Sequence, residues 1–81
     1  MKLYLLSQDE NNGYDTYDSC VVAAENQKDA RRIHPSGNVG TKWDTVFSTW
    51  CKSPSSVKVE LIGEAAPNVK AGVICSSFNA G

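Results

Sequence analysis

Four short apolar runs separated by turn residues constrain the fold of this chain more than any other feature of its sequence. Each run has the length of one β-strand, and together they cover residues 2–7, 17–24, 57–61 and 72–79. In the third run apolar and charged residues alternate, which predicts a strand with one buried face and one wet face. Turn residues lie between the runs, such as Asn12-Gly13 and Pro67-Asn68. The pattern predicts a small antiparallel sheet.

One helix is predicted after the second strand. Asn26 is a good N-cap residue, and the charge of Asp29 suits the positive end of the helix dipole. Pro35 should stop the helix, because the residue before a proline avoids the helical region. Ala30 and Ile33 would form a narrow apolar stripe, and four basic residues fall later in the helix, where cations favour the dipole: Lys28, Arg31, Arg32 and His34. His34 is expected to be exposed at the end of this helix.

The segment 41–52 permits two conformations. Its apolar residues Trp43, Val46, Phe47 and Trp50 follow the spacing i, i+3, i+4 and i+7, which places them on one face of a helix. Several of its residues are aromatic or β-branched, however, and such residues prefer strands. The sequence therefore predicts either a short helix or an ordered aromatic loop.

These elements predict an α+β fold. We expect a small antiparallel sheet of about four strands, with one helix packed on it and an aromatic helix or loop segment beside it. With 81 residues, the chain has material for one core only, so residues 1–81 are expected to form a single domain. Domains of this size are marginally stable.

Composition excludes several classes of function. The net charge is −1, and basic residues are scattered among acidic ones, so no strong electrostatic footprint for nucleic acid is present. No apolar stretch has the length of a signal-peptide core or a membrane span, which predicts a cytoplasmic protein. The three cysteines are odd in number and far apart, as expected for reduced thiols. Cys20 and Cys75 are interpreted as small apolar fillers inside strands.

No catalytic or metal-binding pattern is present in the sequence. A cysteine nucleophile would depend on His34, the single histidine, at a predicted helix end. There is no C-x-x-C pair and no pair of histidines for zinc. A calcium loop that began at Asp9 would need glycine at Tyr14 and glutamate at Cys20, so that pattern fails. We therefore predict a non-enzymatic protein without cofactor or metal.

Two segments are candidates for a protein-binding surface. Tyr14, Asp15 and Tyr17 lie in a loop, and tyrosine gives a large contact area at low entropic cost. The last strand ends in small polar residues and one ring, which could meet a partner closely: Ser76, Ser77, Phe78 and Asn79. The alternative interpretation is structural: the tyrosines cover the sheet edge, and the serines keep an edge strand soluble.

A second set of residues could bind a small ligand. Trp43 and Trp50 could stack on a nucleotide, while Arg31 and Arg32 could bind its phosphates. In a chain this small, however, tryptophans are more often part of the core. Arginines on a short helix are more often simply solvated.

Specific motifs give the chain a family resemblance. It resembles a family of short phage- and prophage-associated proteins in the segments Asn11–Ser19, Val21–Ala24, His34-Pro35, Gly72–Ile74 and Ser77–Gly81. The layout is also similar to a small anti-CRISPR family that inhibits type II-C Cas9 by capping its HNH nuclease site. That resemblance implies that Ser76 or Ser77, on the late strand, would meet the catalytic residues of the nuclease.

These patterns lead to three hypotheses. In the first, the protein comes from a phage or mobile element, acts in the bacterial cytosol as monomer or homodimer, and inhibits a defence enzyme such as a nuclease. In the second, it is a sponge that sequesters a nucleotide immune signal. In the third, it is a housekeeping interaction domain. None of the three involves a membrane, and direct binding of nucleic acid is not expected.

Overall fold

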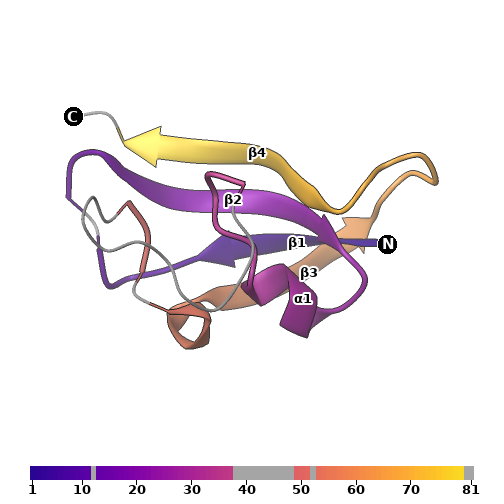
Figure 1. Ribbon diagram of the computed structural model, residues 1–81, viewed down its shortest axis with the longest axis horizontal. Helices are drawn as coiled ribbons and strands as arrows, with labels where there is room; N and C mark the ends of the chain where they lie inside the picture. The colour runs from indigo at the N-terminus through magenta and orange to yellow at the C-terminus, as the bar shows by residue number, and fades with distance from the viewer. Residues whose placement is uncertain (12, 38–48, 52, 80–81) are drawn as a thin grey trace.

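The computed structural model describes residues 1–11, 13–37, 49–51 and 53–79, and its main feature is a four-stranded antiparallel sheet (Figure 1). The strands are β1 (Lys2–Ser7), β2 (Thr16–Ala24), β3 (Lys58–Glu64) and β4 (Gly72–Asn79). Their spatial order is β3-β1-β2-β4, so β3 and β4 form the two edges. The predicted antiparallel sheet is confirmed.

The two central strands, β1 and β2, supply much of the core. Tyr4 lies opposite Val22 and Leu6 lies opposite Cys20, and all four side chains are buried. Because side chains alternate along a strand, these four residues share one face, which we call the covered face. The residues between them, such as Leu5, belong to the opposite face and are only half-buried.

The helix α1 (Gln27–Arg31) packs against β1, β2 and β3 on the covered face (Figure 1). Its predicted N-cap is confirmed, since the Asp29 N–H donates to Asn26 Oδ1 over 2.8 Å. The prediction that Pro35 stops the helix was wrong, because the helix already ends at Arg31. Five residues are too few for a helix that is stable alone. Tertiary packing decides its length, and Ile33 leaves the helix to be buried in the core.

Trp50 is the largest of the fully buried side chains, with 1% of its surface exposed. Its interpretation as a core residue is confirmed, and the residues around it, 49–51, are not helical. Trp43 and most of the predicted aromatic segment lie outside the described residues. A short 3₁₀ helix, Pro54–Ser56, follows and leads into β3.

Two expectations about burial are corrected by the structure. Cys75 is exposed, because it pairs with Val21 and so lies on the face opposite to buried Cys20. His34 is buried, although it was expected at an exposed helix end. Its ring meets Tyr17 edge-on, with 6.2 Å between centroids, and its Nδ1 accepts from the Ser36 N–H over 3.1 Å. Both departures follow from which face of the sheet is covered.

Among the described residues, no helix has the length and apolar character needed to cross a membrane. The helix α1 is only five residues long.

Candidate functional site

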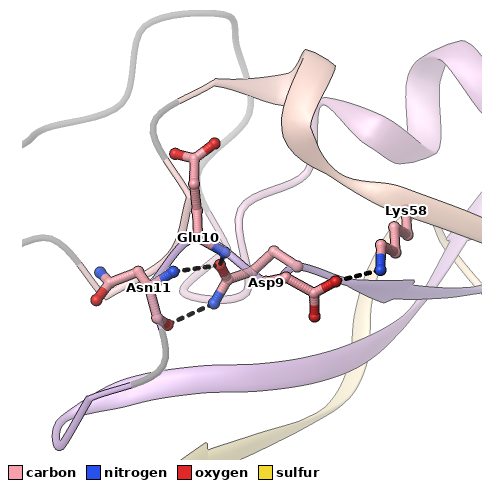
Figure 2. Close-up of polar contacts among 5 residues, drawn as sticks. Asp9, Glu10, Asn11 and Lys58 are labelled. Carbon is pink, nitrogen blue, oxygen red and sulfur yellow. Dashed lines mark hydrogen bonds and ion pairs between the residues drawn. The ribbon is translucent and has the colours of Figure 1, made fainter.

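The loop between β1 and β2 is organised by one buried side chain, Gln8. Its Oε1 accepts from the N–H groups of Glu10 and Asn11, each over 2.7 Å. Its Nε2 donates to the Asn11 carbonyl over 2.6 Å and to the Tyr17 carbonyl over 3.3 Å. Figure 2 shows how Glu10 and Asn11 lie around these bonds. With both ends of its amide bonded, Gln8 holds the base of the loop in one conformation.

Sequence reasoning missed Gln8, although one signal pointed to it. Tyr4, Leu6 and Gln8 continue the two-residue period of buried positions along β1 and just beyond it. A polar residue at the next buried position must satisfy its own hydrogen bonds, and a following turn offers backbone groups for that purpose.

An ion pair links the same loop to the edge strand β3. The Lys58 ammonium contacts the Asp9 carboxylate, as Figure 2 shows. Both side chains are largely exposed, so solvent screens the attraction. The pair therefore orients the loop more than it stabilises the fold.

The tip of the loop is bonded to the end of β4. The Asp15 N–H donates to the Asn79 carbonyl over 2.5 Å, and Asn79 Nδ2 donates to the Gly13 carbonyl over 3.3 Å. Thr16 Oγ1 also donates to the Gly13 carbonyl, over 2.6 Å. Asp15 has a left-handed backbone (φ 59°), a conformation that aspartate tolerates better than most residues. Segments distant in sequence thus form one continuous surface.

We call this region the loop–strand surface, defined as residues 13–18 and 76–79. Tyr14 is 76% exposed and Phe78 is 45% exposed, so two aromatic side chains are available to a partner. Tyr17 is half-buried and supports Phe78 edge-on, with 4.8 Å between ring centroids. The structure therefore brings the predicted protein-binding residues together, with Tyr17 as a support.

The two candidate serines face opposite sides of the sheet. Ser76 pairs with Cys20 and so lies on the side of the covered face. Ser77 pairs with Ser19 on the opposite side, where its Oγ donates to Asp18 Oδ2 over 3.5 Å. Both serines are exposed. We call the side opposite the covered face the open face. A partner that approaches the open face would meet the hydroxyl of Ser77.

The alternative ligand-binding residues are not gathered in the same way. Arg31 Nη1 donates to the Val57 carbonyl over 2.8 Å and to the Pro54 carbonyl over 3.4 Å, so this side chain holds the chain before β3. Arg32 instead lines a pocket of about 220 Å³ beside Glu25 and Asp29. Trp50 is buried, and Trp43 lies outside the described residues. No nucleotide-stacking face is formed by Trp50.

Burial also sets the chemistry of the thiols and the imidazole. It raises the pKa of the Cys20 thiol to about 12, with a further contribution from Cys75. The pKa of Cys51 is raised to about 11, first by burial and then by the Glu10 charge. Burial lowers the pKa of His34. Since the thiolate is the nucleophile, these raised pKa values leave very little of the reactive form of Cys20 and Cys51 at neutral pH.

Within the described ranges, no three His, Cys, Asp or Glu side chains are grouped so as to hold a metal ion. Comparisons of the chain with protein-family models, with curated proteins and with solved structures found no match.

Proposed function

We propose that this protein is a non-enzymatic inhibitor of phage or mobile-element origin that covers the active site of a bacterial immune nuclease with its loop–strand surface. The origin and the target class rest on the resemblance to phage proteins and to an anti-CRISPR family. One structural observation carries the choice of surface: the Tyr14 loop and the end of β4 are joined by hydrogen bonds between Asp15, Gly13 and Asn79.

The composition of this surface suits a contact with a nuclease. Tyr14 and Phe78 supply aromatic anchors, and aromatic residues are enriched at protein interfaces. Asp15 and Asp18 are exposed carboxylates. A nuclease site attracts the negatively charged phosphate backbone of nucleic acid. These carboxylates carry the same negative charge as the phosphates, so the site should attract them too. The Ser77 hydroxyl can bond to a catalytic side chain.

Preorganisation also supports binding at this surface. The side chains of Gln8 and Thr16 bond to backbone groups of Glu10, Asn11 and Gly13, so these described parts of the loop lose little conformational freedom when a partner binds. Tyr17 backs the Phe78 ring in the same way. The Phe78 ring and the backbone next to Tyr14 are therefore held in place before any encounter.

The test is inhibition of DNA cleavage by a purified type II-C Cas9, together with binding to its isolated HNH domain. Tyr14→Ala and Phe78→Ala should each weaken inhibition at least about tenfold, as expected for interface anchors. Leu61→Ala is the matched control, because Leu61 is 56% exposed, between Phe78 and Tyr14, but lies on the β3 edge. Its inhibition should equal that of the wild type.

Absence of both binding and inhibition would overturn this target. A nucleotide that co-purifies with the protein, with no protein partner, would favour the sponge instead. Loss of inhibition in Leu61→Ala but not in Tyr14→Ala would move the contact surface to the other edge of the sheet.

A further inference from the structure

The two edges of the sheet differ in the features that keep edge strands from pairing. Natural edges are protected by charged residues, by proline or by a covering segment. The β3 edge carries Lys58, Glu60 and Glu64, and Lys58 pairs with Asp9. Both edge strands have a register shift against their inner neighbour, which in β4 falls at Ile74, so bulges do not distinguish the two edges. The β4 edge, with the sequence GVICSSFN, differs in having neither a charged residue nor a proline along its eight residues.

The outer side of β4 is also open. Residues 74–78 are all exposed, including Ile74 at 49% and Phe78 at 45%. In Figure 1, β4 forms the outermost strand, and among the described residues β2 is the one strand that pairs with it. A strand of eight residues extends over roughly 27 Å and offers a row of backbone donors and acceptors.

We propose that two copies of this chain pair antiparallel along β4 and form one continuous eight-stranded sheet. A twofold axis brings the same strand onto itself, so the strand must be complementary to its own sequence. An uncharged strand meets this condition, since no like charges come to lie opposite each other. With a net charge of −1, the two copies also repel each other only weakly.

The exposed apolar residues define the register. When the axis passes through Ser76, each Ile74 lies opposite the partner's Phe78, in two symmetric pairs. An aromatic side chain beside a β-branched one is a favourable cross-strand pair. When the axis passes through Cys75, Ile74 lies opposite a serine and Phe78 opposite a glycine. The register centred on Ser76 therefore buries the apolar side chains that each copy leaves exposed.

The mass in solution tests the pairing. Sedimentation of the reduced wild-type protein should give twice the chain mass of 8.8 kDa, with dissociation on dilution. Ser76→Lys places two charges against each other at the axis and should give the mass of one chain. Leu61→Lys, on the β3 edge, is the matched control and should remain dimeric. A wild-type protein that stays monomeric at millimolar concentration, or a monomeric Leu61→Lys with a dimeric Ser76→Lys, would overturn the proposal.

A single exposed thiol tests the register. In a Cys75→Ser/Ser76→Cys double variant, the two new thiols lie directly opposite each other at the axis, so mild oxidation should give a covalent dimer on a non-reducing gel. Cys75→Ser alone keeps only buried thiols and should give none. A dimer that fails to cross-link would overturn the register centred on Ser76.

This pairing stands apart from the proposed inhibition, because it needs no nuclease. It does make a connected prediction: the covalent dimer hides Ser76 and Ser77, so it should inhibit less than its reduced form. If the reduced protein inhibits nothing, the proposed target fails while the dimer measurements still stand.

Discussion

The two faces of the sheet differ sharply, although neighbouring residues of the same strands build them. On the covered face, Leu6 and Val22 are fully buried beneath α1 and the segment around Trp50. On the open face, Leu5 and Val21 are only half-buried. The residue types are the same, so composition does not make the difference. The difference comes from α1 and the residues around Trp50, which pack on the covered face.

The cysteines give the largest expected contrast between the faces. Cys75 should react with a thiol reagent in the native protein. Cys20 and Cys51 should react only after the protein unfolds, because they are buried and their pKa values are raised. If exposure of the buried thiols needs global opening of at least about 5 kcal/mol, their labelling should be slower by more than about 1,000-fold. Mass spectrometry of the labelled peptides measures the rates. Equal labelling rates for Cys20 and Cys75 would show that the two faces of the sheet do not differ in access to the reagent.

Two adjacent leucines offer a matched pair for stability. Leu6→Ala removes a fully buried side chain and should lower the free energy of unfolding by about 2–5 kcal/mol. Leu5→Ala, one position away on the open face, should cost about 1 kcal/mol. Urea unfolding followed by Trp fluorescence compares the two variants. Similar losses would show that both faces are covered in solution.

The single histidine gives the smallest expected effect. Burial lowers the pKa of His34 in the folded protein, so the unfolded chain binds the proton more readily. Stability should therefore be full above the unfolded pKa of about 6.5 and fall as the pH decreases towards the folded pKa. One group changes the free energy of unfolding by at most about 1.4 kcal/mol per pH unit.

The measurement is urea unfolding at several pH values between 7.5 and 5.5. Since the chain has one histidine, no other imidazole contributes to the slope. His34→Gln, which does not titrate, is the control and should flatten the profile. A wild-type profile that is already flat would mean that the ring is solvated in the native state.

Local patterns predicted much of the secondary structure. The strands Lys2–Ser7 and Gly72–Asn79 have the predicted bounds, and β2 begins one residue earlier than expected. The third strand begins at Lys58 and continues to Glu64, beyond the alternating pattern. The Asn26 cap was recognised because an N-cap bonds within its own turn. These features depend on residues a few positions apart, which a sequence displays directly.

The candidate site could be predicted only in part. Tyr14 and Phe78 were predicted as contact residues from their type and their surroundings in the sequence, and the structure places both on the surface. Their junction depends on hydrogen bonds from Asp15 and Asn79 between distant segments, which no local pattern encodes. The support from Gln8 was missed, because its partners are backbone groups of a loop whose path was unknown.

By itself, the sequence determined the α+β class, three of the four strands to within a residue, the helix start and the uncharged character of β4. Only the tertiary structure decided the strand order, the early end of the helix, the burial of His34 and the opposite environments of Cys20 and Cys75. The physical reason is that strand propensity and capping act over a few residues. Burial depends instead on which distant segment crosses which face, and that choice exists only once the sheet has formed.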